Sequence, residues 1–141
     1  MTPYIEFASN HPYMFMALFI VVALIIKTEI ESRLSGVKQT GAMEAVRLMD
    51  DEGMLILDVR EASEYSAGHL RQALHIPVSA VKSRLNELEK YKNKPILAYC
   101  RSGNRSNTVA RQLKKSGYEN VHNLAGGIMA WTNASLPVTK K

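Results

Sequence analysis

Residues 7–26, a run of twenty near the N-terminus, carry no charged side chain, and this stretch restricts the possible folds more than any other feature. From Tyr13 onward its only polar group is the tyrosine hydroxyl. A helix of roughly 20 residues rises about 30 Å, the thickness of the hydrocarbon layer of a membrane. Pro12 suits the first turn of such a helix, where its missing N–H removes no hydrogen bond. The stretch therefore predicts a transmembrane helix over residues 7–26.

Two other structures for this stretch are disfavoured by its surroundings. In a chain of 141 residues, no second helical layer is available to cover an apolar helix on every side. A cleaved signal peptide begins with basic residues and ends at a cleavage site made of small residues. Here Glu6 precedes the stretch, and Lys27, Thr28 and Glu29 follow it. We therefore expect an uncleaved anchor in contact with membrane lipid.

The flanking charges predict the orientation of this anchor. Lys27, Arg33 and Lys38 follow the stretch, and no lysine or arginine precedes it. Positive charge stays on the cytoplasmic side of a membrane helix, so we expect the N-terminus outside and the rest of the chain in the cytoplasm. In a bacterium the membrane would be the inner one. The expected segments are a tail at 1–6, the helix at 7–26, a polar juxtamembrane linker at 27–38 and a domain at 39–141.

The chain has one cysteine, Cys100. A single cysteine excludes an intramolecular disulfide, a zinc site built of cysteines and a Cys-x-x-Cys redox motif. A reducing compartment such as the cytoplasm suits a thiol that must stay free. We expect no metal and no cofactor, and any second thiol must come from another molecule.

The formal net charge is +5, and the basic residues gather in the second half of the chain. From Lys82 to the end there are twelve basic and three acidic residues. This distribution is typical of a solvated basic face, and it also suits a field that attracts a small anion or acidic lipids. No aromatic stacking platform accompanies the lysines, which disfavours a nucleic-acid partner.

After residue 39, apolar strands alternate with amphipathic helices. The predicted strands are 54–59, 96–99 and 120–124. The predicted helices run from 42 to near 53, over 61–66, from a cap at Ser79 through Leu88, over 106–115, and up to Trp131. Such alternation predicts an α/β domain with a parallel sheet covered by helices on both faces. Ligands of these sheets bind beyond the carboxyl ends of the strands, where Cys100 follows residues 96–99.

The loop after this strand carries the side chains and amides of a nucleophilic anion site. Backbone N–H groups and the positive end of the following helix should surround the sulfur and favour its thiolate. Gly103 and Asn104 tolerate the positive φ that a curled loop requires. Arg101 and Arg105 add positive charge. The candidate site residues are Cys100, Arg101, Ser102, Gly103, Asn104, Arg105 and Ser106.

This loop resembles the active-site loop of rhodanese-domain sulfurtransferases, and the resemblance extends over about a hundred residues. The matching elements, in chain order, are Asp58-Val59-Arg60, Glu64-Tyr65, Gly68-His69-Leu70, Ile76-Pro77, the loop itself, and Leu124-Ala125-Gly126-Gly127-Ile128 with Ala130-Trp131. Two positions depart from the family pattern: Gln72 stands where the family usually has glycine, and His75 where it usually has asparagine. Both lie outside the reactive loop.

The resemblance implies a rhodanese-like fold and a sulfur-transfer reaction. Sulfurtransferases of this family resemble Cys-x4-Arg, the spacing of Cys100 and Arg105, whereas the related phosphatases have a loop longer by one residue. The thiolate is expected to take the outer sulfur of a small anionic donor such as thiosulfate, with Arg101 stabilising the sulfite that leaves. The resulting persulfide passes sulfur to cyanide or to an external thiol on a small molecule or a protein.

Asp58 and Arg60 lie at the end of the adjacent strand as supporting residues, and the resemblance implies that Asp58 orients the loop or an arginine through hydrogen bonds rather than acting as a base. For His69 a structural hydrogen bond is favoured over a role as base, since amides already ionise the sulfur. One alternative from another class remains open. The chain can also be a membrane-tethered interaction module, with a possible membrane-protein partner and only incidental turnover.

Overall fold

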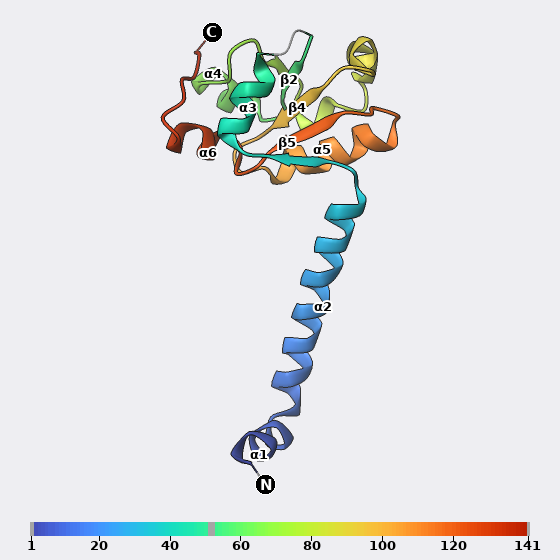
Figure 1. Cartoon of the computed structure of the whole chain (residues 1–141), viewed down its shortest axis with the longest axis vertical. Helices are drawn as coiled ribbons and strands as arrows, with labels where there is room; N and C mark the ends of the chain where they lie inside the picture. Colours follow the sequence, from blue (N-terminus) through green and yellow to red (C-terminus); the bar gives the residue numbers. More distant parts are fainter. Residues whose placement is uncertain (1, 51–52, 141) are drawn as a thin grey trace. The chain divides into compact units, whose positions relative to one another are not determined.

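The computed structural model describes residues 2–50 and 53–140 (Figure 1). The chain divides into two compact units, Met1–Ser35 and Gly36–Lys141, and each is described by itself. The first is helical, and the second contains the sheet.

The N-terminal unit consists of helices α1 (Pro3–Asn10) and α2 (Pro12–Leu34). The helix breaks at His11, where φ is −130° and ψ is 55°. Within the described residues, α2 alone is long and apolar enough to cross a membrane, with a mean hydropathy of 2.1 over its most apolar window. The break lies inside the predicted span 7–26, and α2 continues through Leu34 into the region expected as a linker.

The second unit is built on a parallel sheet in the order β1-β5-β4-β2-β3. Its strands are β1 (Lys38–Thr40), β2 (Leu55–Asp58), β3 (Leu74–His75), β4 (Ile96–Tyr99) and β5 (Val121–Leu124). Every residue of β2, β4 and β5 is buried. Burial on both faces accounts for the nearly continuous apolar runs of β2 and β4, whereas β5 buries two polar side chains, His122 and Asn123. The predicted α/β class with a parallel sheet is confirmed.

Two layers of helices cover the sheet (Figure 1). The helices are α3 (Ala42–Met49), α4 (Ala62–Ala67), α5 (Asn104–Lys115) and α6 (Gly127–Asn133), with 3₁₀ segments η1 (Val78–Ala80) and η2 (Leu85–Tyr91). On one face α5 packs Val109 and Leu113 into a core that contains Cys100. On the other face α3 and α6 contribute Ala45 and Trp131 to a second core. The two cores place side chains that alternate along a strand on opposite sides of the sheet.

Three details of the secondary structure differ from the prediction. The single helix expected from Ser79 to Leu88 is wrong: Ser79 lies inside η1, and the chain breaks at Arg84, where φ is −113°, before η2 begins. The apolar spacing was read correctly as a buried stripe, since Val81 and Leu88 are buried, but it does not distinguish an α-helix from 3₁₀ turns. The edge strands β1 and β3 were not predicted because each has at most three residues.

Candidate active site

Cys100 directly follows β4, and its side chain faces the core that α5 covers. The residue has no exposed surface. Its Sγ lies 3.1 Å from the Gly103 amide nitrogen and 3.3 Å from the Ser106 hydroxyl oxygen, both placed as donors. The sulfur therefore sits inside the loop, facing hydrogen-bond donors from the next six residues.

Burial and hydrogen bonds act in opposite directions on this thiol. Burial alone would raise the pKa of Cys100, because it disfavours the charged form. Hydrogen bonds from the Ser106 hydroxyl and from the backbone amides of Ser106, Gly103 and Ser102 outweigh burial, so the pKa is lowered. A lowered pKa increases the fraction of thiolate, the nucleophilic form, at neutral pH.

Gly103 makes the tight loop possible. Its φ of +99° is in the left-handed region, and a Cβ there would lie 3.2 Å from the Leu124 carbonyl oxygen and 3.4 Å from the Gly126 nitrogen. A side chain would therefore be both strained and crowded. The expectation that Gly103 takes a positive φ is met, whereas Asn104 is already the first residue of α5.

The first turn of α6 holds the other side of the loop. The Ile128 N–H donates to the Cys100 carbonyl at 2.9 Å, and the Met129 N–H donates to the Arg101 carbonyl at 3.1 Å. Gly127 permits this approach, because a Cβ on it would overlap the Arg101 carbonyl. The loop carbonyls thus point away from the sulfur, and the loop amides point toward it.

Arg105 is held by a carboxylate from α4. Its two terminal nitrogens each lie 2.9 Å from an oxygen of Glu64, in a bidentate ion pair. The Arg105 hydrogen bonds lower the pKa of Glu64 to about 2, and the same pairing raises the pKa of Arg105. Arg105 also interacts electrostatically with Cys100. An anion that binds Arg105 near the sulfur therefore displaces Glu64 or binds beside the ion pair.

The remaining loop residues line the outside. Arg101, Ser102 and Asn104 are exposed, whereas Ser106 is buried. The structure thus brings Cys100 together with the Ser102, Gly103 and Ser106 amides and with Arg105. The side chains of Arg101 and Asn104 are left at the surface.

Asp58 and Arg60 form a buried network of their own. The Arg60 guanidinium donates to both carboxylate oxygens of Asp58, with 2.7 Å for the shortest contact, and to the Gly68 carbonyl at 2.7 Å. The Tyr99 hydroxyl donates to Asp58 at 2.7 Å and accepts the Leu70 N–H at 3.0 Å. Tyr99 belongs to the second core, on the face of the sheet opposite Cys100.

Two histidines near this network make structural contacts. His69 bonds to the Tyr65 carbonyl at 2.9 Å, and its ring stacks on Tyr65 at 3.8 Å. His75 bonds to the Arg60 carbonyl at 2.7 Å and stacks on Tyr65 at 4.6 Å. Gln72 adopts a φ of +63°, in the left-handed region that glycine adopts without strain. This explains why glycine is usual at this position in the family that the sequence resembles.

Sequence reasoning missed one residue behind the loop. Asn123 on β5 is buried, and its amide bonds to the Ser106 hydroxyl, to the Gly103 carbonyl and to Gln39. A polar amide inside an otherwise buried strand was the available signal, since buried polar groups require partners.

In the described part of the chain, no group of three or more histidine, cysteine, aspartate or glutamate side chains is arranged to hold a metal.

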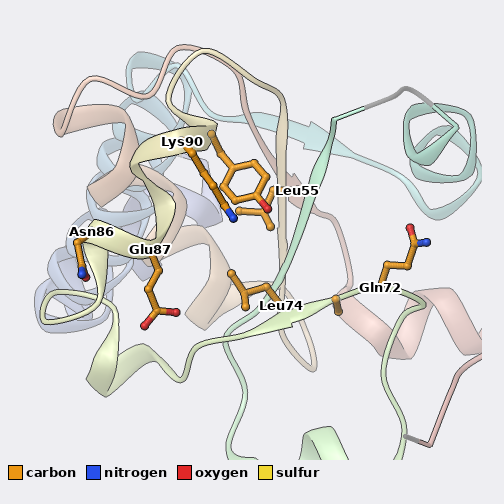
Figure 2. A pocket seen from close by; sticks show the side chains of 8 residues that line it. Leu55, Gln72, Leu74, Asn86, Glu87 and Lys90 are labelled. Carbon is orange, nitrogen blue, oxygen red and sulfur yellow. The ribbon is translucent and has the colours of Figure 1, made fainter.

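A cavity lies elsewhere in the domain (Figure 2). It has a volume of about 600 Å³ and lies between Leu55 at the start of β2, the segment around β3, and η2. Its wall is apolar at Leu55 and Leu74 and polar at Gln72, Asn86, Glu87 and Lys90. None of the candidate site residues lines it, so the cavity is separate from the Cys100 loop.

Comparison with known proteins places this architecture in a family. The profile of the family "Rhodanese-like domain" matches residues 42–134. The uncharacterized protein YibN of Escherichia coli strain K12 is 29% identical over 136 residues, which cover 96% of this chain and 95% of that protein.

Several relatives carry names that state an activity. A protein named sulfurtransferase from Allochromatium vinosum is 38% identical over 92 residues, covering 65% of this chain and 84% of that protein. A thiosulfate sulfurtransferase, GlpE, from Coxiella burnetii is 33% identical over 94 residues, covering 67% of this chain and 86% of that protein. Among solved structures, a rhodanese-related protein from Thermoplasma volcanium superposes with a TM-score of 0.66 at 27% identity, covering 74% of this chain and 99% of that one.

Proposed function

The chain belongs to the rhodanese-like domain family, and from this premise we propose that it is a sulfurtransferase that carries sulfane sulfur as a persulfide on Cys100. The observation that carries the proposal is the set of donors around Sγ, which come from Ser102, Gly103 and Ser106. They stabilise negative charge on the first sulfur, as a thiolate nucleophile requires.

The reaction divides into two displacements at sulfur. The Cys100 thiolate attacks the outer sulfur of an anionic donor such as thiosulfate, a new S–S bond forms, and the S–S bond of the donor breaks. The electron pair of that bond leaves with sulfite. An acceptor, either cyanide or the thiolate of a small molecule or protein, then attacks the outer sulfur, and the electron pair of the persulfide bond returns to Cys100.

Arg105 and Arg101 supply the positive charge for the anionic donor. Arg105 is paired with Glu64, so the donor must exchange with that carboxylate or bind beside the ion pair. Arg101 is exposed at the outer side of the loop, where it can stabilise the departing sulfite. Because Cys100 has no exposed surface here, side chains around the loop must move before the donor reaches the sulfur. Asp58 and Arg60 act as scaffold under the neighbouring loop.

Intact-mass spectrometry of the chain after incubation with thiosulfate tests this function. We expect a gain of about 32 Da, one sulfur atom, on the wild-type protein and no gain on Cys100→Ser. Addition of cyanide should return the wild-type mass to its starting value. Equal loading of the two proteins, or no loading of the wild type by thiosulfate or by a persulfide donor, would reject the assignment of Cys100.

The expected localisation is part of the proposal. We propose that α2 anchors the chain in a membrane, with the N-terminus outside and the domain in the cytoplasm. If the source is bacterial, this membrane is the inner membrane. The supporting observations are the length and apolarity of α2 and the position of Lys27 and Arg33 near its C-terminal end. Cytosolic thiols would then be available as acceptors, and membrane lipid or a membrane protein would be neighbours of the anchor.

Single cysteines placed on either side of the anchor test the topology. In a Cys100→Ser background, Thr2→Cys should react with an impermeant maleimide in intact cells, or in spheroplasts of a bacterium. Ser35→Cys should react only after lysis. The reverse pattern would place the domain outside, and release of the protein by a carbonate wash would indicate a helix that only lies on the surface.

A further inference from the structure

Asn123 lies behind the Cys100 loop with all three of its amide hydrogen-bonding groups in use. Its Nδ2 donates to the Gly103 carbonyl at 3.1 Å and to the Gln39 side-chain oxygen at 2.9 Å. Its Oδ1 accepts the Ser106 hydroxyl at 2.6 Å. Two of these three partners belong to Gly103 and Ser106, residues that also contact the sulfur, Gly103 through its N–H and Ser106 through its hydroxyl.

The sheet register explains how Gln39 reaches this amide. Gln39 on β1 is the direct cross-strand partner of Asn123 on β5. The Gln39 Nε2 in turn donates to the Asn107 side chain at 3.0 Å, in the first turns of α5. Because both N–H groups of Asn123 have acceptors, its oxygen must face Ser106. The Gly103 carbonyl and Gln39 together determine which way the buried amide points.

From these contacts we propose that Asn123, oriented by Gly103 and Gln39, is a positioning residue for Cys100: it holds the Gly103 carbonyl and the Ser106 hydroxyl so that the backbone amides of both residues stay directed at the sulfur. The inference deepens the proposed function and rests on it, since the sulfur that is positioned is the one assigned to carry the persulfide. It adds β1 and β5 to the elements that shape a site otherwise made of one loop.

One competing effect has the opposite sign. Ser106 has a single hydroxyl hydrogen, and Asn123 Oδ1 and Cys100 Sγ both lie where they can accept it. If Asn123 mainly withheld that hydrogen from the sulfur, its removal would lower the thiol pKa. If it mainly holds the loop, removal raises the pKa, because the backbone amides of Gly103 and Ser106 move away from the sulfur. The measured direction therefore distinguishes the two roles.

The pH dependence of alkylation by iodoacetamide measures this pKa without any sulfur transfer. The single cysteine makes the signal specific. We expect Asn123→Ala to raise the thiol pKa by about half to one unit, the equivalent of one hydrogen bond, and Gln39→Ala to raise it by less. Gln112→Ala, the same substitution near the other end of α5, should leave it unchanged. Arg105, which interacts electrostatically with the sulfur, and its partner Glu64 are retained in all three variants.

Each outcome decides the proposal. An unchanged or lowered pKa in folded Asn123→Ala overturns it. If that variant does not fold, Gln39→Ala decides, because Gln39 is exposed and its loss leaves no cavity; an unchanged pKa there overturns the proposal. Raised pKa values together with absent sulfur loading of the wild type would reject the sulfurtransferase role and leave the positioning of the thiol standing.

Discussion

The loops that follow β2 and β4 start from neighbouring strands, paired in register at Asp58 and Tyr99, and both carry arginine. After β2, Arg60 folds back onto Asp58, and both side chains are buried. After β4, the buried group is the Cys100 thiol, and the donors around it are mostly backbone amides. Two loops at one edge of the sheet thus surround a buried carboxylate and a buried sulfur by different means.

The two loops differ in how the charge of the buried group is balanced. Burial disfavours the Arg60 charge, but its hydrogen bonds and charge interaction with Asp58 outweigh burial and raise the pKa of Arg60. The carboxylate and guanidinium together leave no net charge. In the Cys100 loop the amides carry only partial charge, and the cation that interacts with the sulfur, Arg105, is already paired with Glu64. A scaffold results in the first case, and a nucleophile in the second.

The largest expected effect is a loss of stability in Asp58→Ala. Asp58→Ala leaves the Arg60 charge buried and unpaired, which should cost about 3–5 kcal/mol in the free energy of unfolding. Urea unfolding of the unit 36–141 measures this loss. Glu119→Ala, an exposed carboxylate, serves as the control. A folded Asp58→Ala variant of wild-type stability would show that the network is not the scaffold of its loop.

Arg105→Ala tests the Cys100 loop, which follows β4. It removes a charged hydrogen-bonding group from the anion site, a loss of about 1.5–3 kcal/mol, which corresponds to roughly ten- to a hundredfold in kcat/KM for thiosulfate. Steady-state kinetics with thiosulfate and cyanide measure the change. Arg101→Ala, at an exposed position of the same loop, should have the smaller effect. An unchanged kcat/KM for Arg105→Ala would show that Arg105 only braces the loop through Glu64.

Tyr99→Phe tests the contact between the ends of β4 and β2, where the two loops begin. The substitution removes the hydroxyl that bonds to Asp58 and leaves the Leu70 N–H without this acceptor. We expect a loss of about 1–3 kcal/mol in unfolding free energy and an unchanged thiol pKa. Urea unfolding and the pH dependence of alkylation provide the two measurements. A shifted thiol pKa would mean that the two faces of the sheet are coupled through β4.

Glu64→Gln should have the smallest effect, visible only through its dependence on pH. The folded-state pKa of Glu64 is about 2, below its ordinary 4.5, so the ionised carboxylate stabilises the fold above pH 4.5 and this contribution is lost as the pH falls toward 2. Because the ion pair is partly exposed, the contribution is about 1 kcal/mol or less. The stability difference between wild type and variant should therefore vanish on acidification. A difference that persists at pH 2 would assign the effect to packing, as would one matched by Glu119→Gln.

The sequence predicted those features that depend on a single strand or loop. Residues 96–99 were predicted as a buried strand that delivers Cys100 at its carboxyl end, and β4 has these bounds. The positive φ of Gly103 also follows from local chemistry, since only glycine adopts it without strain. By contrast, Ser79 to Leu88 carried a helical spacing that two 3₁₀ segments satisfy equally well.

The sequence by itself determined the parallel sheet, the apolar helix near the N-terminus and the reactive loop, because each is encoded in consecutive residues. Only the tertiary structure decided the partners of that loop. Glu64 lies 41 positions before Arg105, and Gln39 lies 84 positions before Asn123. Contacts between residues so distant depend on strand order and register, which no local pattern specifies. For the same reason the structure, and not the sequence, separated the buried Asp58–Arg60 pair from the sulfur on the opposite face of the sheet.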